Sequence, residues 1–423
     1  MNYILKNARI IDPGRGIDAV GDIGIENGLV ADPGKVKKPT VMDLAGKVLT
    51  PGFIDLHVHL RQPGNTMAET IASGTAAAAA GGFTSVVAMP NTSPAADTAG
   101  AIEYLRQTAA RTGVVRVLPC GCMTKGYAGQ EMAGIGSLKT AGVVALSDDG
   151  KCIQDHALMR HVVEYAKSFE LPILDHCEDN FLAAGGVMHE GKWSVLLGMN
   201  GMNGAAEELM ISRNIILARQ IGWSIHMQHV SVKESVDLLR KARAEGIAVT
   251  GEATPHHLSL TDENIKKYDT NYKMNPPLRS EEDRQALIRG VADGTITAIA
   301  TDHAPHTATA KLVEFDHAPF GIIGLETALC VTYTVLVDSG IMPLAEYVKR
   351  LTTGPAEILR MKGYDLAEGK AADITVFDPV AEYVIDPAKF KSKSRNTPFG
   401  GRKVKCRPLL TFVGGKLVYA FEG

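Results

Sequence analysis

The chain has 423 residues, of which 45% are hydrophobic and 22% are charged. A single hydrophobic core stops growing near ~250–300 residues, so we expect one large α/β domain with a smaller domain beside it. The composition excludes a disordered chain, and a formal net charge of −3 gives no reason to expect nucleic acid or an anionic membrane as a partner.

The sequence also lacks the features of a secreted or membrane-spanning protein. Its first residues do not follow the basic, then apolar, then small-residue pattern of a signal peptide, and its apolar runs are too short to span a bilayer. The six cysteines are scattered without CxxC spacing, which argues against a disulfide framework and a zinc ribbon. We therefore expect the protein in the cytoplasm.

Apolar runs rich in β-branched residues alternate with helix-forming stretches between residues 52 and 340. The expected strands are Phe53–Leu60, Phe83–Met89, Val114–Cys122, Val143–Leu146, Pro172–Asp175, Ser224–Gln228, Ile247–Ala253 and Ile296–Ala300. The expected helices between them include Met67–Ala80, Asp155–Phe169, Ala205–Ile221, Lys233–Glu245 and Ser280–Ala292. Strand then helix, repeated about eight times, is typical of a (β/α)8 TIM-type barrel, although an open doubly wound sheet begins the same way. The glycine-rich connection Gln130–Ala141 makes a poor helix.

The two ends of the chain have a different pattern, that of short strands separated by turns. Met1–Thr50 contains the turn signals Asp12-Pro13-Gly14 and Glu26-Asn27-Gly28. In the tail the expected strands are Ala372–Phe377, Leu410–Val413 and Gly415–Tyr419. Neither end can bury a core alone, so we expect residues 1–50 and 366–423 to pair in one small β-domain beside a barrel of residues 51–365.

Histidine and aspartate residues follow the carboxyl ends of most of the expected strands. In chain order they are His57, His59, Asp148, Asp149, His176, His229, His256, His257, Asp302, His303 and His306. In a parallel barrel the carboxyl ends of all strands gather on one face, where active sites lie. We therefore expect these residues to meet at one mouth.

The alternating pair His57-Val58-His59 suits a metal, because residues two apart in a strand point to the same side and zinc accepts imidazole ligands. The alternative is two histidines that end a strand in satisfied hydrogen bonds. The convergence of further strands that end in His or Asp favours the metal. Asp302 ends an apolar strand, where a charge is costly unless it is paired or bound to a cation.

The other strand-end residues have competing interpretations. Asp149 can bridge two cations or serve as the N-cap or turn residue of Ser147–Gly150, and the second role suits Asp148 better. His176 and His229, each taken alone, also fit buried structural roles. We expect supporting roles for His256, His257 and His303, core packing for Cys177, and no chemistry at Cys120 and Cys122.

On these motifs the chain resembles the amidohydrolase superfamily and, within it, the bacterial class I dihydroorotase family. The resemblance covers essentially the whole chain. The segments that carry it are Pro51–Gly64, Ala88–Thr92, Ser147–Gly150, Asp175–Glu178, Gln228–Ser231, Asn275–Arg279, Thr301–His306 and Ala318–Glu326.

The resemblance implies a binuclear zinc centre with two Zn2+ ions per subunit. His57, His59 and Asp302 would hold one ion, and His176 and His229 the other, with Asp149 as the bridge. Many relatives bridge their metals with a carboxylated lysine, and Lys151 lies nearby, so Asp149 and a modified Lys151 both stay open as the bridge.

The resemblance also implies the substrate and the reaction. The substrate-binding residues would be His59, Arg61, Asn91, Asn275, His306 and the backbone of Phe320 and Gly321. Asp302 would serve as the catalytic acid and base in the reversible hydrolysis of (S)-dihydroorotate to N-carbamoyl-L-aspartate, the third step of de novo pyrimidine biosynthesis. A homodimer is expected, as is an association with another enzyme of that pathway. The stretch Thr307–Asp316 matches no motif, and we expect a mobile loop over the mouth.

Two rival functions remain at this point. Hydantoinases, dihydropyrimidinases and allantoinases also open cyclic amides, but dihydropyrimidinase substrates lack the ring carboxylate that a guanidinium such as that of Arg61 binds bidentately. A non-catalytic structural homologue is disfavoured because a competent residue occupies every expected metal position.

Overall fold

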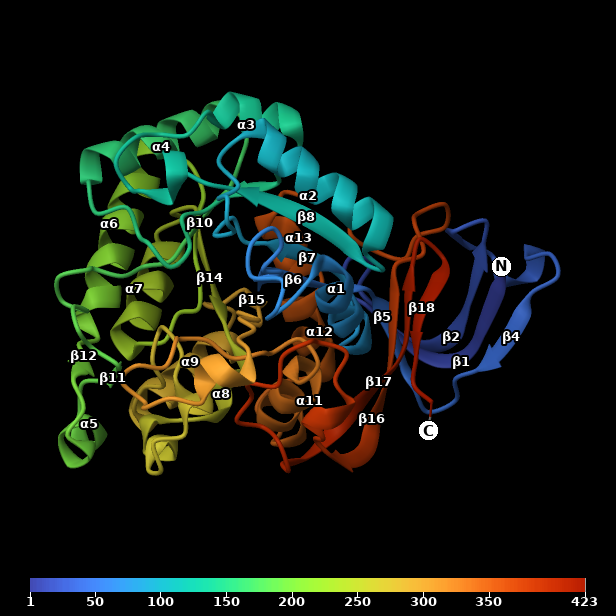
Figure 1. Cartoon of the computed structure of the whole chain (residues 1–423). Helices are drawn as coiled ribbons and strands as arrows, with labels where there is room; N and C mark the ends of the chain where they lie inside the picture. The colour runs from blue at the N-terminus through green and yellow to red at the C-terminus, as the bar shows by residue number, and fades with distance from the viewer. Residues whose placement is uncertain (423) are drawn as a thin grey trace.

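Eight parallel strands form the barrel in the computed structural model, which describes residues 1–422 (Figure 1). In their order around the sheet they are β6 (Phe53–Val58), β7 (Phe83–Ala88), β8 (Arg116–Gly121), β9 (Ala145–Leu146), β10 (Ile173–Asp175), β13 (Ile225–Met227), β14 (Val249–Ala253) and β15 (Ala298–Ile299). The sheet closes beyond β15, where Val58 pairs with His303 in a parallel bridge and the His59 amide donates to the His303 carbonyl oxygen at 2.9 Å. This arrangement confirms the predicted barrel.

Helices surround the barrel and connect its strands (Figure 1). They are α1 (Ile71–Ala80), α2 (Ala99–Thr112), α3 (Ile135–Ala141), α4 (His156–Ser168), α6 (Ala205–Ile221), α7 (Lys233–Ala244), α9 (Glu281–Ala292), α12 (Leu344–Leu351) and α13 (Thr353–Ile358). Shorter elements are β11 (Met188–His189), α5 (Lys192–Leu197), β12 (Gly201–Met202), α8 (Pro255–Ser259), α10 (Ala308–Lys311) and α11 (Ala328–Tyr333). None of the helices within residues 1–422 combines the length and apolarity that crossing a membrane requires.

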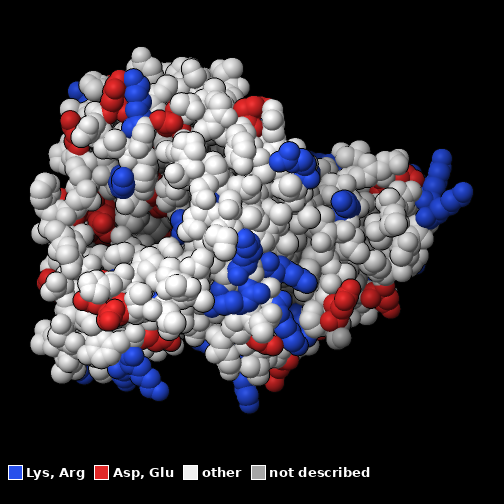
Figure 2. All heavy atoms as spheres, viewed as in Figure 1, with Lys and Arg blue, Asp and Glu red and all other residues white. Residues whose placement is uncertain are grey.

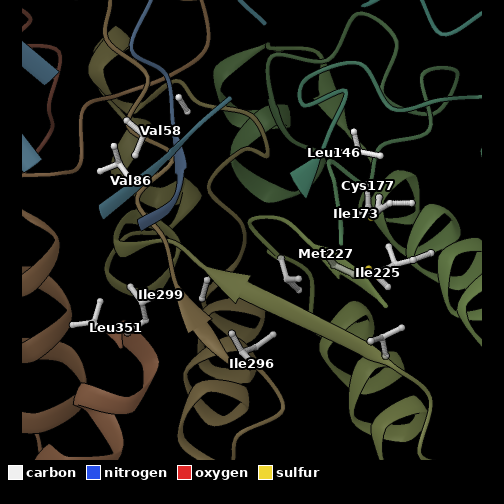
Figure 3. Packing of buried hydrophobic residues seen from close by; sticks show 14 of the residues in the cluster. Val58, Val86, Leu146, Ile173, Cys177, Ile225, Met227, Ile296, Ile299 and Leu351 are labelled. Carbon is white, nitrogen blue, oxygen red and sulfur yellow. The ribbon is translucent and has the colours of Figure 1, made fainter. Parts of the chain in front are cut away.

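The main core lies between the barrel strands and these helices, as Figure 3 shows for part of it. Val86, Ile173, Ile225 and Ile299 are fully buried on the outer side of the sheet. Strands covered by helices on a closed parallel sheet need apolar residues on both faces, which explains their nearly continuous apolar sequences. The packing thereby fixes the height at which each strand ends.

The inside of the barrel has an apolar side and a polar side. The apolar side includes Ile54, Leu56, Val87, Leu174 and Ala298. The polar side consists of three residues on β13 and β14, namely buried His226, half-buried Thr250 and buried Glu252, joined by hydrogen bonds. A charged residue inside a barrel is costly unless it is paired, and Glu252 is paired with two imidazoles, those of His57 and His226.

Both ends of the chain contribute to a second sheet, as predicted. Its strands are β18 (Lys416–Ala420), β17 (Lys403–Val413), β16 (Ile374–Val384), β5 (Val48–Pro51), β1 (Tyr3–Asp12), β2 (Ile17–Glu26) and β3 (Leu29–Ala31), and β4 (Thr40–Asp43) pairs with β1. The two ends meet where β5 pairs with β16, and Tyr3 packs edge-on against Phe412 with ring centroids 5.2 Å apart.

On the face seen in Figure 2, acidic and basic side chains are interspersed, with Lys and Arg gathered near the centre.

Three local expectations were wrong. A helix does form in the second half of Gln130–Ala141, where α3 spans Ile135–Ala141. Gly142 caps its end in the left-handed conformation at φ 101°. The first barrel helix begins at Ile71, since the Thr70 side chain accepts from the Ser73 amide and caps it there. The stretch Thr307–Asp316 is not all loop: it carries α10 and is held at buried Lys311, whose Nζ donates to three backbone carbonyls.

Candidate active site

The two histidines of the first strand are brought together by an irregularity in β6. The register of β6 against β7 shifts between Asp55 and Val58. There the Asp55 carboxylate accepts from the His57 amide at 3.1 Å and from the Thr301 amide at 3.0 Å. The rings of His57 and His59 lie 5.3 Å apart, so the alternating pair does face one space, as predicted.

Hydrogen bonds fix which nitrogen of each ring faces that space. His57 Nδ1 lies 2.9 Å from Glu252 Oε1, and His59 Nδ1 lies 2.9 Å from Asn91 Oδ1. Both partners accept, so Nδ1 carries a proton in each ring, and in the neutral imidazole Nε2 keeps its lone pair. A partner on the far nitrogen orients metal-binding histidines in this way.

Asp302 and Asp149 face the two Nε2 atoms. Asp302 Oδ1 lies 3.0 Å from His59 Nε2 and 3.5 Å from His57 Nε2. Asp149 Oδ1 lies 3.2 Å from His57 Nε2, and its Oδ2 lies 3.3 Å from His59 Nε2. The ligand atoms of His57, His59 and Asp302 all fall within 4.8 Å of one another, which is compact enough for one cation.

A second group also faces Asp149. His176 Nδ1 and His229 Nε2 are 2.8 Å apart, and they lie 3.6 Å and 3.7 Å from Asp149 Oδ1. His57, Asp149 and His229 also form a group with all ligand atoms within 4.8 Å. Asp149 thus faces histidines of both sets, as a bridging carboxylate would.

Lys151 does not share this position. Its side chain is exposed, its Nζ lies 3.5 Å from the carbonyl oxygen of Tyr127, and it stands over the Tyr127 ring. Of the two candidate bridges, Asp149 is therefore the residue that faces the histidines.

The chemistry of these donors fits metal cations. Every member of the set is buried, and His57 Nε2, His176 Nε2 and His229 Nδ1 have no hydrogen-bond partner among residues 1–422. Burial favours neutral imidazole, but Asp149 and Glu178 outweigh it and raise the pKa of His176 to about 10. Burial would also favour a neutral acid at Asp302, yet His57 and His59 hold its pKa below the ordinary value. The cluster therefore attracts positive charge, and imidazole with carboxylate is a donor set that suits zinc.

A cavity of about 260 Å³ opens over this cluster at the mouth of the barrel. Its lining includes every residue expected to bind substrate, namely His59, Arg61, Asn91, Asn275, His306, Phe320 and Gly321. Asp149, His176, His229 and Asp302 also line it. His57 is not part of this lining and is fully buried. The fold thus brings residues from 57 to 321 into one site.

Polar groups in the cavity are held in place but retain hydrogen-bonding capacity. Arg61 Nε donates to the Pro305 carbonyl at 3.2 Å, and the guanidinium makes no other hydrogen bond within residues 1–422. Asn275 Nδ2 donates to Glu178 at 2.8 Å, and its Oδ1 is buried without a partner in the part of the chain that the structure describes. An unsatisfied buried acceptor is costly, so Asn275 favours a ligand that donates from N–H.

The backbone of Phe320 and Gly321 is already engaged. The Phe320 carbonyl oxygen accepts from His306 Nε2 at 2.7 Å, and the Gly321 amide donates to the Lys273 carbonyl oxygen at 3.0 Å. A Cβ on Gly321 would come within 2.7 Å of the Ala304 Cβ, so this position requires glycine. The pair shapes the wall of the cavity.

Sequence reasoning missed four residues that support the site. Glu252 and Gln228 contact His57, Glu178 contacts Asn275, and Asn396 contacts the loop around His306. Glu252 did carry a signal, because a glutamate within an apolar parallel strand must be paired. Asn396 carried none, because it approaches from a distant part of the chain.

The remaining strand-end residues support the structure. Asp148 is a turn residue of its own segment, as expected, since the Lys151 amide donates to its carbonyl oxygen at 2.9 Å. Its carboxylate also accepts from the Met123 amide at 2.8 Å and so holds the preceding loop. His257 Nε2 donates to the Pro276 carbonyl at 3.0 Å, and His303 Nε2 lies 3.3 Å from Glu69. Cys177 is buried among core residues, as expected.

Comparisons with known proteins bear on this arrangement. Residues 46–235 match the family model described as dihydro-orotase-like. A protein named dihydroorotase from a Thermoanaerobacter species is 48% identical over 99% of this chain and 97% of its own length. One of the same name from Endomicrobium trichonymphae is 47% identical over 99% and 100%.

Solved structures show the same fold. An L-hydantoinase (dihydropyrimidinase) from Arthrobacter aurescens has a TM-score of 0.88 and 25% identity, covering 99% of this chain and 96% of its own. A dihydropyrimidinase from Brevibacillus agri has a TM-score of 0.86 and 23% identity, covering 99% and 95%.

Proposed function

The chain belongs to the dihydroorotase family of cyclic amidohydrolases, and from this membership we propose which residues carry its reaction. The enzyme hydrolyses a cyclic amide, converting (S)-dihydroorotate to N-carbamoyl-L-aspartate and back, the third step of de novo pyrimidine biosynthesis. It is a metal-dependent enzyme of the amidohydrolase type. The observation that carries the assignment of residues is the convergence of His57, His59, His176, His229 and two carboxylates beneath one polar cavity.

We assign the metal as two Zn2+ ions. His57, His59 and Asp302 would hold the first ion, His176 and His229 the second, and Asp149 both. When bound, such a pair lowers the pKa of water from ~15.7 toward ~7 and polarises the amide carbonyl. The protein's own residues bind and orient the ring and move the proton.

Arg61 would bind the ring carboxylate through the free face of its guanidinium, in the bidentate geometry that carboxylates favour. The partnerless Asn275 Oδ1 would accept from a ring N–H, and His306 closes the same wall of the cavity. These contacts would place the scissile amide above Asp302.

Asp302 would accept the proton of the attacking water at a carboxylate oxygen and return it to the departing nitrogen. It is suited to this because its carboxylate is held ionised by His57 and His59 and lies at the floor of the cavity. In the reverse direction the same carboxylate would take the proton from the carbamoyl nitrogen as the ring closes.

The wider setting follows from the family. We propose that the enzyme acts in the cytoplasm as a homodimer, with an association with another enzyme of the pyrimidine pathway. Its partner in the reaction is the small-molecule substrate.

The deciding experiment measures metal content and reversible ring opening on one preparation, with dihydroorotate, hydantoin and dihydrouracil as substrates. We expect about two zinc ions per chain and turnover of dihydroorotate far above the other two. Stripping with a chelator should abolish turnover, and added Zn2+ should restore it. Preference for dihydrouracil would contradict the role of Arg61, since that ring has no carboxylate.

A further inference from the structure

A chain of hydrogen bonds runs down the inside of the barrel from the metal cluster. Thr250 Oγ1 lies 2.8 Å from His226 Nδ1, His226 Nε2 lies 3.0 Å from Glu252 Oε2, and Glu252 Oε1 lies 2.9 Å from His57 Nδ1. His226, Glu252 and His57 are 1% exposed or less. These three residues are thus sealed from solvent.

With both imidazoles neutral, as imidazole ligands of a cation are, one arrangement of protons satisfies all three contacts. Glu252 as a carboxylate only accepts, so both imidazoles must donate to it. His226 then keeps a lone pair on Nδ1, which accepts from the Thr250 hydroxyl. The donor and acceptor of every hydrogen bond in this series are therefore set. This arrangement leaves the Nε2 lone pair of His57 facing Asp149 and Asp302.

Glu252 also reaches the second metal subsite. Its Oε1 accepts from the backbone amide of His229 at 3.3 Å. His229 has φ 32°, a conformation that residues other than glycine rarely adopt, so this contact helps to hold it. One buried carboxylate thereby orients a ligand of each proposed ion.

The end of this hydrogen-bond series that is farther from the metal cluster lies at a polar pocket. This pocket is at the opposite end of the barrel from the mouth. His226 and Thr250 line this pocket together with Ser224, Thr297 and Arg243. The hydrogen-bond series therefore spans the barrel, and its Thr250 end lies beside polar groups.

From this geometry we propose that Glu252 and His226 are positioning residues for the metal centre. Glu252 holds His57 in the tautomer and orientation that bind the cation, and His226 acts through Glu252 by holding its second oxygen. The inference rests on the metal ligands proposed above. It explains why a glutamate and a histidine occupy a barrel interior that is otherwise largely apolar.

The test measures Zn2+ affinity of the metal-stripped protein by competition with a chromophoric chelator, with no substrate present. Losing a partner behind a ligand histidine weakens metal affinity by about 10–100-fold. We expect Glu252→Gln to show a loss in that range. His226→Leu should weaken the same binding step less, and His226→Gln should restore much of it because its amide can donate in place of Nε2. The double variant E252Q/H226L should bind no more weakly than E252Q alone.

The matched control is Glu207→Gln. Glu207 is also buried and accepts from Ser231 and Val232, but it touches no ligand imidazole. It should keep Zn2+ affinity within about twofold of the parent, whatever it does to the melting temperature of the metal-free protein.

Affinity in E252Q equal to the parent, or an equal loss in E207Q, would overturn the proposal. If E252Q does not fold, the difference between H226L and H226Q decides it, and equal affinities for these two would refute it. A parent protein that bound no Zn2+ would overturn the proposed metal centre itself, so the two failures are distinguishable.

Discussion

The guanidinium of Arg61 is fastened to the loop that follows the last barrel strand, where Nε donates to the carbonyl oxygen of Pro305 at 3.2 Å. Arg61 lines the cavity, and its backbone lies in the left-handed region with φ 56°. We expect Arg61→Met to lower kcat/KM for dihydroorotate by about 100-fold or more, since a charge-assisted hydrogen bond contributes about 1.5–3 kcal/mol and two are lost.

Steady-state kinetics with Arg61→Lys provides the comparison. Lysine keeps the charge but not the planar fork, so its kcat/KM should fall between the parent and the methionine variant. Zinc content should be unchanged in both, because Arg61 is not among the proposed ligands. Kinetics of Arg61→Met indistinguishable from the parent would refute its role as the carboxylate-binding group.

The acid–base role of Asp302 is open to a direct test. Asp302→Asn keeps the shape of the side chain and an oxygen that can face His59, but it removes the ability to take up a proton. We expect kcat to fall by about 10²–10⁴-fold, the range typical of a lost general base. Metal analysis of the same sample is essential, because a variant that retains both ions and near-full activity would rule out Asp302 as the base.

Acid should destabilise the fold through His189, which lies away from the metal cluster on β11. Burial, with Arg279 nearby, lowers the pKa of His189 to about 4, and its Nδ1 accepts from Arg279 at 3.4 Å. The unfolded chain titrates near 6.5. Between these values the unfolded state binds more protons, so the free energy of unfolding falls as the pH drops.

The effect is measurable by urea unfolding of the metal-stripped protein at pH 7 and pH 5. Over this interval the parent should lose about 2 kcal/mol more than His189→Gln, which has no titrating group there. Above pH 7 the pH dependence of the two should run in parallel. An identical loss in both proteins would show that His189 is not held neutral in the folded state.

The sequence predicted the barrel and the meeting of its strand-end His and Asp residues because both depend on local pattern. Alternation of apolar strands with helices specifies the parallel sheet, and strand ends specify which residues share its mouth. His57 and Asp302 could therefore be placed together although 245 positions separate them, as the distance of 3.5 Å between Nε2 and Oδ1 bears out. Helix starts such as Ile71 were less predictable, since a single side-chain cap decides them.

Residues that act through tertiary contacts could not be found in this way. Glu178 and Asn396 bind partners 97 and 90 positions away along the chain, and no periodicity links those positions. Glu252 was visible only as a charge out of place in a strand, and its partner His57 became known only from the closed barrel. The interior of a barrel mixes side chains from several strands, and their pairing is a property of the closed sheet.

Asn396 holds together the two loops that form one wall of the cavity. Its Oδ1 accepts from the His306 amide at 3.1 Å, and its Nδ2 donates to the carbonyl oxygens of Ala304 and Gly321, both at 3.1 Å. We expect Asn396→Ala to raise KM for dihydroorotate by about tenfold or more, because each lost hydrogen bond contributes roughly 1 kcal/mol to the placement of His306. Asn396→Asp keeps the acceptor and should be affected less.

Ser394→Ala is the matched control for this prediction. Ser394 lies on the same buried segment but donates to the Ala68 carbonyl, away from the cavity wall, so its loss should leave KM unchanged. Zinc content and melting temperature, measured for all three variants, separate a displaced wall from general unfolding. If Asn396→Ala and Ser394→Ala raised KM equally, the effect would come from loosening the segment, and the specific bonds of Asn396 would have no part in placing His306.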